Sequence, residues 1–212
     1  MSHRVIQNLL GLDGAADLLA YAIANEESFV PTGVGTENEP VARMRASRRL
    51  TDLGPYLALV EQCVWPLVPG LIADLQLTRF RATELEIELV AHENGAFYKR
   101  HIDLFTDSAR LAGDRLVSLV IYLNEQPMRF EGGELRLYPQ INPAGMSDQG
   151  AIDIVPEHGL AVAFSSWMPH EVRPVACPSG EFRHARFAIN CWVLRTHDTG
   201  GTPNTLHEGP AR

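Results

Sequence analysis

The first third of the chain carries its apolar residues at helical spacing. Asp13 is predicted to cap a helix, whose repeating apolar positions are Leu18, Leu19, Ala22 and Ile23. A second helical region runs from about residue 55 to 75. It is predicted to form two short helices, because Pro66 and Pro69 do not fit an uninterrupted helix interior. Between the two regions, "SFVPTGVGTENEPVARMRASRRL" predicts a long loop with a short strand.

From residue 84 onward the pattern changes to that of strands. "ELEIELVA" alternates acidic and apolar residues, whereas "RLVSLVIYLN" is nearly all apolar, as in a strand buried on both faces. "GGELRLYP", "GLAVAFSS" and "RFAINCWVL" continue the series. The pattern predicts a mainly β fold with N-terminal helices, in which a double-stranded β-helix (jelly roll) carries the helices on one sheet. We expect one domain over residues 1–212, with a helical part at about 1–82, a jelly-roll core at about 83–195 and a flexible tail at 196–212.

Composition narrows the picture by exclusion. The 212 residues carry a formal net charge of -8 and a pI of about 5.4, so the chain lacks the basic field that attracts nucleic acid or an anionic membrane. Three cysteines, Cys63, Cys177 and Cys191, follow no disulfide spacing, which indicates a reducing compartment, and two of them are expected in the core. The N-terminus does not read as a signal peptide, and we find no run of about 18 apolar residues. These features predict a soluble cytoplasmic protein without nucleic-acid or membrane partners.

Candidate chemistry begins in "YKRHID", where His101 and Asp103 are two residues apart. Side chains at positions i and i+2 of a strand project to the same face, so these two can converge on one metal ion. A later histidine, His170 in "SSWMPHEVRPV", supplies a third ligand. Two histidines and one carboxylate form the facial triad of non-haem Fe(II) oxygenases, which leaves positions on the metal open. The alternative for the pair alone is a solvated His and Asp on an exposed strand face.

Five blocks in order, "NGAFYKRHID", "RLVSLVIYLNEQ", "GGELRLYP", "PHEVRPV" and "RFAINCWV", resemble the 2-oxoglutarate and Fe(II)-dependent dioxygenases. The resemblance is to the prolyl 4-hydroxylase-like branch, which includes the hypoxia-sensing prolyl hydroxylases and their bacterial relatives. It covers roughly residues 5–194, and its specific part covers residues 94–193. It implies that His101, Asp103 and His170 are the iron ligands, with no further catalytic side chain beyond the metal centre.

The same resemblance implies a 2-oxoglutarate site. Arg186 matches the family's basic residue that holds the distal carboxylate, and a guanidinium fork suits that task. Further matches near the cosubstrate are Tyr122, Ser118 and Val172. Strand alternation adds a cavity-lining set: Arg186, Ala188, Asn190 and Trp192. Because "ACPSGEFRHA" lengthens the interval after His170, Arg183 is a rival for the carboxylate.

One further departure concerns a tyrosine that many relatives carry nine or ten residues before the first iron histidine. His92 and Ala91 occupy those positions here. Parity with Ile87 and Leu89 favours Ala91 as the cavity position, so that one hydrogen bond to the cosubstrate or substrate is expected to be lost.

The function that the resemblance implies is hydroxylation of an unactivated C–H bond with Fe(II), 2-oxoglutarate and O2, releasing succinate and CO2. Ascorbate is a candidate reductant. A prolyl residue in a protein or peptide is the favoured substrate, and a free amino acid or small metabolite is the competitor. Two other classes stay open, namely a cupin-like metal enzyme or isomerase that does not use 2-oxoglutarate, and a non-catalytic sensor or binding module. The sequence predicts no oligomeric state.

Residues for the primary substrate are the least determined. Tyr98, Arg45 and Arg48 are the candidates. Arg43 and Arg49 complete a group of four arginines in an otherwise acidic chain, which would form a positive rim that steers an acidic substrate. The alternative is an ordinary solvated charge cluster.

Overall fold

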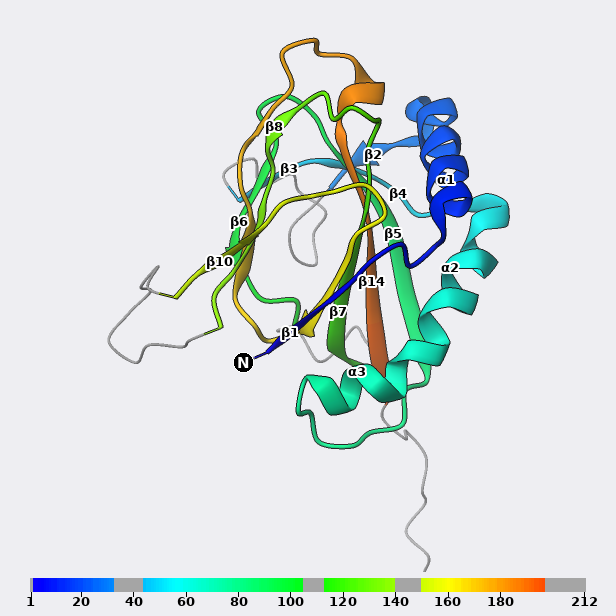
Figure 1. The fold of residues 1–212 in the computed structure, drawn as a ribbon, viewed down its shortest axis with the longest axis vertical. Coiled ribbons are helices and arrows are strands. Elements are labelled where there is room, and N and C mark those ends of the chain that lie inside the picture. Colours follow the sequence, from blue (N-terminus) through cyan, green and yellow to red (C-terminus); the bar gives the residue numbers. More distant parts are fainter. Residues whose placement is uncertain (1, 33–43, 105–112, 140–149, 197–212) are drawn as a thin grey trace, which may run out of the picture.

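The computed structural model describes residues 2–32, 44–104, 113–139 and 150–196. Two antiparallel sheets face each other, and the helices cover the outer face of the larger one (Figure 1). In the described residues the larger sheet has seven strands, in the order β1 (His3–Ile6), β11 (Ala161–Ser165), β7 (Gly113–Leu123), β14 (Arg186–Thr196), β5 (Glu84–His92), β4 (Arg48–Leu50) and β2 (Val30–Pro31). The smaller sheet has five, in the order β10 (Ile152–Ile154), β9 (Leu135–Leu137), β12 (His170–Val172), β6 (Phe97–His101) and β3 (Arg45–Ala46). The predicted mainly β jelly-roll architecture is confirmed.

A short third sheet pairs β8 (Glu131–Gly132) with β13 (Val175–Ala176). This ribbon pairs the segment just before β9 with the segment that follows β12. The predicted tail at 196–212 lies almost entirely outside the described residues, and the single-domain boundaries stay a prediction.

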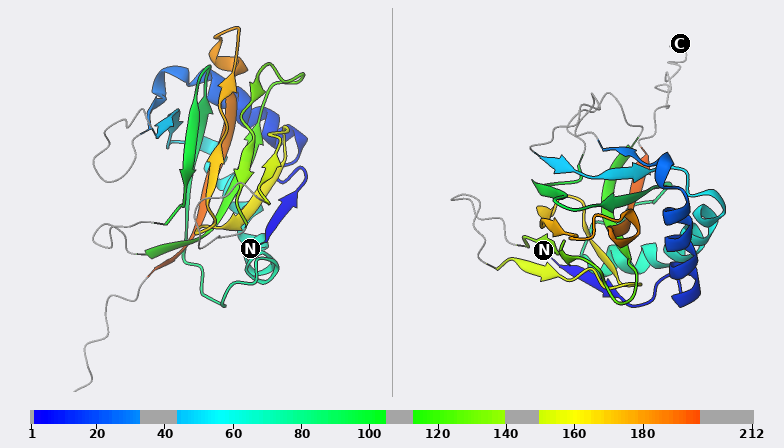
Figure 2. Two further views of the ribbon diagram at one scale, coloured as in Figure 1. Left: turned by 90° about the vertical axis from the view of Figure 1, so that its left-hand side faces the viewer. Right: turned by 90° about the horizontal axis from the view of Figure 1, so that it is seen from above.

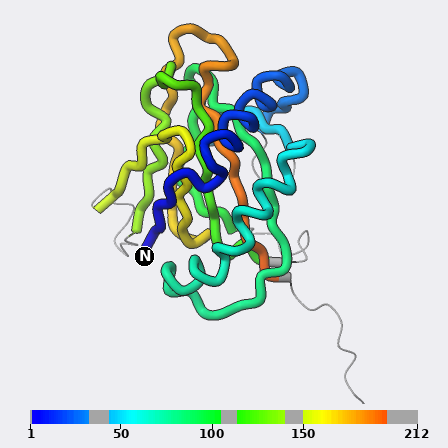
Figure 3. The backbone as a smooth tube through the Cα atoms, turned by 45° about the vertical axis from the view of Figure 1, so that its right-hand side comes forward, coloured from blue at the N-terminus to red at the C-terminus, as the bar shows by residue number. Residues whose placement is uncertain are grey.

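The helices are α1 (Leu12–Ala24), α2 (Leu57–Val64) and α3 (Val68–Asp74), with 3-10 turns η1 (Glu26–Ser28), η2 (Gly54–Tyr56), η3 (Trp65–Leu67) and η4 (Phe182–His184). The chain passes from β1 into α1, and α1 lies beside α2 over the large sheet (Figure 3). The rings of Tyr21 and Tyr56 meet at 5.3 Å between α1 and the start of α2. As predicted, the segment with Pro66 separates two short α-helices, because a proline lacks the N–H that an α-helix interior needs.

The predicted start of α1 is wrong by two residues. Gly11, rather than Asp13, holds the N-cap position, and Asp13 lies in the first turn. Gly11 has a φ of 71°, which residues with a side chain rarely adopt, so glycine is favoured at this bend. An aspartate in the first turn is still favourable because it faces the positive end of the helix dipole.

The helical stretch Gly54–Asp74 is apolar on average, although it contains no uninterrupted run of about 18 apolar residues. It spans 21 residues with a mean hydropathy of 1.4, and by length and composition alone it is apolar enough to cross a membrane. Core helices of soluble proteins pass the same test, and residues of α2 and α3 pack into the core cluster on the large sheet, namely Val60, Val64, Val68, Leu71 and Ile72.

Strand β5 pairs with β14 along its whole length near the centre of the large sheet, and the two faces of this pair differ in chemistry. As predicted from alternation, one face of β14 enters the helix-covered core through Phe187, Ile189, Cys191 and Val193. The opposite face carries the residues at Arg186, Ala188, Asn190 and Trp192. Seen from above, in the right-hand view of Figure 2, the helices gather on one side of the molecule and the small sheet lies on the other.

The predicted orientation of Ala91 is wrong. Ala91 pairs with Phe187 and belongs to the helix-side core together with Leu89. His92 pairs with Arg186 and lies on the inner face. The helices need an apolar surface to pack on, so the alternate positions of β5 that carry Ile87, Leu89 and Ala91 face them. The other alternate positions, which carry Glu88 and His92, face inward.

A second apolar cluster joins the two sheets. It combines residues of the large sheet and of β9 in the small sheet, namely Val120, Tyr122, Leu135, Leu137, Val162, Phe164 and Ala188. Burial of these side chains fixes the separation of the sheets beside the candidate site. All three cysteines are free, with Cys177 and Cys191 buried, which agrees with the expectation of no disulfide framework.

Candidate active site

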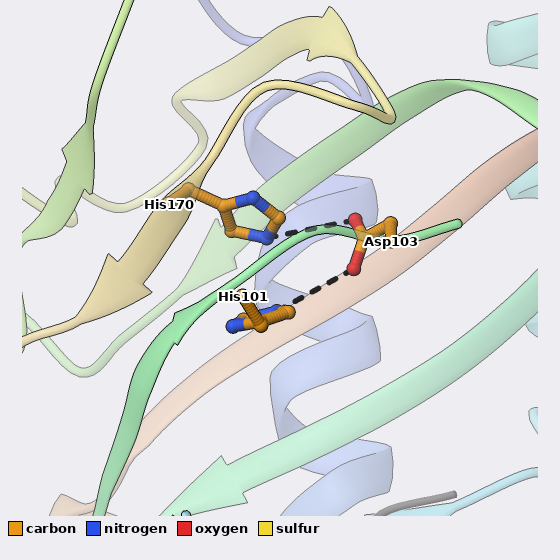
Figure 4. A group of neighbouring side chains, drawn as sticks. All are labelled: His101, Asp103 and His170. Atoms are coloured by element: carbon orange, nitrogen blue, oxygen red, sulfur yellow. Dashed lines mark ion pairs between the residues drawn. The ribbon is translucent and has the colours of Figure 1, made fainter. Parts of the chain in front are cut away.

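His101, Asp103 and His170 come together between the two sheets (Figure 4). His101 ends β6 and His170 begins β12, and these two residues are directly paired in the small sheet. Asp103 follows β6 and turns its carboxylate toward both rings, at 3.5 Å from His101 Nε2 and 3.6 Å from His170 Nε2. One ligand atom from each residue lies within 4.8 Å of the others, a spacing at which a single ion can contact all three.

Backbone hydrogen bonds fix how both imidazoles face this point. Nδ1 of His101 donates to the carbonyl of Lys99 at 2.8 Å, and Nδ1 of His170 donates to the carbonyl of Met168 at 2.9 Å. The proton of each neutral ring is therefore on Nδ1, and the lone pair of Nε2 faces the carboxylate. Burial, followed by the neighbouring His101, lowers the pKa of His170 to about 4. His170 is thus neutral at pH 7, as a metal ligand must be.

Two side chains from the large sheet hold the Asp103 carboxylate. The Ser118 hydroxyl donates to Oδ2 at 2.6 Å, and the Trp192 indole N–H donates to the same oxygen at 2.9 Å. The backbone N–H of Asp103 donates to the carbonyl of Ser166 at 2.8 Å. Burial alone would raise the pKa of Asp103, but His170, His101 and the Ser118 hydroxyl together bring it below its usual range. A carboxylate ionised and oriented in this way suits a cation.

Tyr98 covers one side of the triad. Its ring stacks on the His101 ring with centroids 3.4 Å apart and planes 14° from parallel. On its other side the guanidinium of Arg45 lies 4.8 Å from the ring centroid. Burial raises the pKa of Tyr98, so its hydroxyl keeps its proton. The predicted substrate residue Tyr98 therefore lies directly against an expected metal ligand.

Arg186 is the largest fully buried side chain in the described residues, with 1% of its surface exposed. Its Nε donates to the carbonyl of Gly133 at 2.6 Å, and Nη1 lies 3.4 Å from Nδ1 of His92. Within the described residues, Nη2 of Arg186, the hydroxyl of Tyr122 and Nε2 of His92 are buried without a hydrogen-bond partner. Buried polar groups are normally satisfied, so this cluster of unpaired groups fits a bound anion.

Gly133 is required for this arrangement. Its φ is 70°, and a Cβ there would lie 2.7 Å from Arg186 Cδ and 3.0 Å from Val175 Cγ2. The backbone of Gly133 can therefore approach Arg186 closely enough to accept its Nε–H only because it has no side chain.

Arg183, the rival for the same task, lies elsewhere. Its guanidinium donates to Glu125 Oε1 at 2.6 and 2.9 Å, and its side chain is 56% exposed. It belongs to η4 in the loop that follows β13. The geometry thus favours Arg186 for a buried carboxylate.

The predicted rim arginines are ion-paired. Arg45 and Arg49 reach the two oxygens of Glu88 at 3.4 and 3.5 Å, and Glu88 also accepts from Asn190 at 3.2 Å. Arg48 lies near Glu93 at 3.5 Å and Glu26 at 3.9 Å. The fourth arginine, at position 43, lies outside the described residues. The three described arginines are not free cations, and this pairing weighs against the steering role.

Among the other predicted cosubstrate residues, Val172 is half-buried in β12 opposite Leu135. Ser118 and Trp192 make their hydrogen bonds to Asp103, as described above. The sequence reading missed His92, Glu88 and Gly133 as parts of the site. The acidic alternation of "ELEIELVA", continued through Val90 to His92, is the signal that could have placed Glu88 and His92 on the polar inner face.

Comparison with known proteins gives the family. The model of the 2OG-Fe(II) oxygenase superfamily matches residues 87–194, which is half of the chain and includes every site residue just described except those of β3 and β4. The chain belongs to this superfamily. The family implies Fe(II), 2-oxoglutarate and O2, and the unpaired donors around Arg186 together with the His/Asp/His set fit the first two.

Three relatives add detail. An uncharacterised PKHD-type hydroxylase of Synechocystis is 29% identical over 194 residues, which is 90% of this chain but only 62% of that protein's length. A prolyl-4-hydroxylase from Pseudomonas putida is 27% identical with a TM-score of 0.65, covering 92% of this chain and 93% of that one. A prolyl hydroxylase from Trichoplax adhaerens, solved with a hypoxia-inducible factor peptide, is 24% identical with a TM-score of 0.67, covering 91% and 83%, and shows the shared fold. These likenesses place the chain among prolyl 4-hydroxylase-like oxygenases.

Proposed function

We propose that this chain is a 2-oxoglutarate- and Fe(II)-dependent hydroxylase that acts on a prolyl residue in a protein or peptide. The observation that carries the proposal is the combination of a His/Asp/His triad with a buried guanidinium on the same inner face, whose Nη2 has no partner among the described residues. A metal site alone would suit many enzymes. A second site for an anion is what a dicarboxylate cosubstrate requires.

In this proposal His101, Asp103 and His170 hold Fe(II) through Nε2, a carboxylate oxygen and Nε2. Arg186 and Tyr122 bind the distal carboxylate of 2-oxoglutarate. When bound, iron and 2-oxoglutarate together supply the activation of O2 and the oxidising power for C–H hydroxylation. The protein's own tasks are to orient Asp103 through Ser118 and Trp192, to keep His170 neutral, and to surround the carboxylate with donors in place of water.

The prolyl substrate is supported by the relatives. The Pseudomonas putida protein is named as a prolyl-4-hydroxylase, and the Trichoplax adhaerens protein was solved with a peptide. Tyr98, whose ring lies between His101 and Arg45, is proposed to border the substrate position near the iron. A free amino acid or small metabolite remains the competing substrate class. A cavity-facing Ala91 in place of the relatives' tyrosine would favour this class, but Ala91 faces the helices.

A cupin-like enzyme without 2-oxoglutarate is disfavoured by Arg186. Burying a guanidinium without a carboxylate partner costs several kcal/mol of folding free energy, of the order found for unpaired buried charges. Burial, its largest influence, lowers the pKa of Arg186, and Tyr122 partly opposes this shift. A protein with no anionic ligand would gain nothing from retaining such a group.

The decisive experiment measures succinate release and product mass. The protein is supplied with Fe(II), 2-oxoglutarate and O2, together with proline-containing peptides or free amino acids. We expect succinate formation coupled to a peptide product heavier by one oxygen atom. His170→Ala should abolish both, whereas His3→Ala, on edge strand β1, should leave both intact. Coupled turnover on a free amino acid alone would assign the small-molecule class, and unchanged turnover in His170→Ala would falsify the iron site.

Three predictions stand beside this proposal without support from the comparisons. They are use of ascorbate as a reductant, a cytoplasmic location, and the absence of nucleic-acid and membrane partners. Ascorbate dependence is measurable in the same assay over many turnovers.

A further inference from the structure

His92 is the least expected member of the inner face. It is the last residue of β5, lies directly opposite Arg186 in the β5–β14 ladder, and is 3% exposed. Its Nδ1 lies 3.4 Å from Nη1 of Arg186, and its Nε2 is buried with no partner among the described residues. A histidine buried in this way normally satisfies both nitrogens.

The neighbours of His92 determine its protonation. Burial, then Arg186 and then Arg45, hold the pKa of His92 well below its ordinary value, so the ring is neutral. A guanidinium can only donate hydrogen bonds, so Nδ1 must be the accepting nitrogen. The proton of the neutral ring is therefore on Nε2, which makes the unpaired nitrogen a donor.

The cluster thus presents three hydrogen-bond donors, and the hydroxyl oxygen of Tyr122 is its one free acceptor. Nη2 of Arg186 can only donate, and burial raises the pKa of Tyr122 to about 12, so its hydroxyl is protonated. The Nε2–H of His92 is the third. A carboxylate offers two oxygens with about four lone-pair sites, whereas a carboxamide would turn an N–H group toward donors. A carboxylate can accept from all three groups at once and brings no N–H group toward Arg186 and His92.

We propose that His92 donates from Nε2 to the distal carboxylate of the cosubstrate and makes the site selective for a carboxylate at that end. This inference rests on the proposed function. It differs from a role in metal binding, because His92 contacts Arg186 rather than the triad. It also assigns a binding role to a position where the sequence suggested only the loss of a tyrosine hydroxyl.

The test compares two ligands on three proteins by calorimetric titration of the Mn(II)-loaded chain. The ligands are 2-oxoglutarate and 2-oxopentanoate, which lacks the distal carboxylate. His92→Phe keeps a flat ring without a donor, and His92→Gln keeps an N–H near the position of Nε2. We expect His92→Phe to weaken 2-oxoglutarate binding about tenfold or more, as for a lost hydrogen bond to a charged group, and to leave 2-oxopentanoate unchanged. His92→Gln should stay within about threefold of the parent protein.

A second measurement is made on the parent protein, and a variant serves only to assign the signal. In protein with 15N-labelled histidine, the Nε2–H resonance of His92, assigned by its loss in His92→Gln, should shift on addition of 2-oxoglutarate but not of 2-oxopentanoate. The inference would be overturned if His92→Phe weakened the binding of both ligands equally, or of neither. It would also be overturned if the resonance did not shift. If the parent protein itself does not prefer 2-oxoglutarate over 2-oxopentanoate, the proposed function fails instead.

Discussion

The indole N–H of Trp192 donates to Oδ2 of Asp103 at 2.9 Å, across 89 residues of chain. Trp192 belongs to the central strand of the large sheet, whereas Asp103 follows a strand of the small sheet. With Ser118 donating to the same oxygen, the large sheet orients a proposed metal ligand that follows a strand of the small sheet. Supporting hydrogen bonds of this kind usually change metal affinity by about 10- to 100-fold.

The first prediction follows from these two donors. Trp192→Phe combined with Ser118→Ala should lower the affinity for Fe(II) or Mn(II) by about tenfold or more, because the carboxylate loses both orienting bonds. Metal titration of the purified protein measures this. Trp65→Phe, at a partly exposed tryptophan in η3, is the matched control and should bind metal normally. Equal affinity in the double variant and the parent would show that Asp103 needs no such support.

The second prediction separates the two arginines. Arg186→Ala should weaken 2-oxoglutarate binding by about 1.5 to 3 kcal/mol, the range for a hydrogen bond to a charged group, and leave metal binding largely intact. Arg183→Ala should change neither, because its partner is the surface residue Glu125. Titration of both variants with 2-oxoglutarate checks this, and the reverse result would return the carboxylate to Arg183.

A third prediction concerns the glycine behind the guanidinium. Gly133→Ala should destabilise the protein and weaken 2-oxoglutarate binding, since the new methyl group would meet Arg186 Cδ at 2.7 Å. Gly180→Ala is the control, because Gly180 has a similar φ of 66° and open space around its Cβ position. Both variants should show the positive-φ cost of about 1 to 2 kcal/mol in thermal unfolding. Only Gly133→Ala should also lose affinity for 2-oxoglutarate.

The fourth prediction is a pH dependence of stability in the metal-free protein. The pKa of His170 falls from 6.5 in the unfolded chain to about 4 in the fold. Between these values the unfolded state binds more protons, so the free energy of unfolding rises with pH and decreases as pH falls. From pH 7 to pH 5 the loss should be about 2 kcal/mol from this group. His92, whose pKa is also lowered, acts in the same direction.

Chemical denaturation at several pH values measures this loss. His170→Gln, which cannot titrate, should show a shallower dependence than the parent protein. Saturation with Mn(II) should stabilise the fold more strongly at pH 7 than at pH 5, because protons compete with the metal for the histidines. A stability that is level from pH 7 to pH 5 in the parent would contradict the buried neutral imidazole.

The fifth prediction tests the arginine rim. Because Arg45 and Arg48 are paired with Glu88, Glu93 and Glu26, we expect Arg45→Gln with Arg48→Gln to leave the salt dependence of substrate binding unchanged. The double variant should instead lose stability, since Arg45 leaves a carboxylate that is only 8% exposed. Binding across a salt series with a turned-over peptide decides between the two roles. A reduced salt slope would restore the steering hypothesis.

The parts of the fold that sequence alone could supply are those set by local periodicity. The alternation of "RFAINCWVL" placed Arg186 and Trp192 on the inner face, and the i, i+2 spacing brought His101 and Asp103 together. The face of β5 that carries His92 could not be predicted, because alternation divides a strand into two faces without showing which of them packs against the helices. That choice is made by packing.

Contacts that depend on the register between strands far apart in the sequence could not be predicted from the sequence pattern. The ion pairs of Glu88 with Arg45 and Arg49 join β5 to β3 and β4, whose alignment is set by strand pairing rather than by any local pattern. Gly133 is likewise visible only from the approach of Arg186 to its backbone. Such contacts leave no repeating pattern in the sequence, because each is made by a single pair of residues.

Strand β14 is the last strand that the structure describes, yet it lies between β7 and β5 at the middle of the large sheet. During synthesis on the ribosome, the strands on either side are complete while their common neighbour is still missing. Until it is inserted, β5 and β7 each present an open edge of unpaired N–H and C=O groups, the kind of edge on which aggregation begins. All three triad residues have been synthesised by then, but the indole and the guanidinium arrive only with β14. A nascent chain can therefore gather the proposed metal ligands before it can orient them, because Asp103 receives the hydrogen bond of Trp192 only after β14 has joined the sheet.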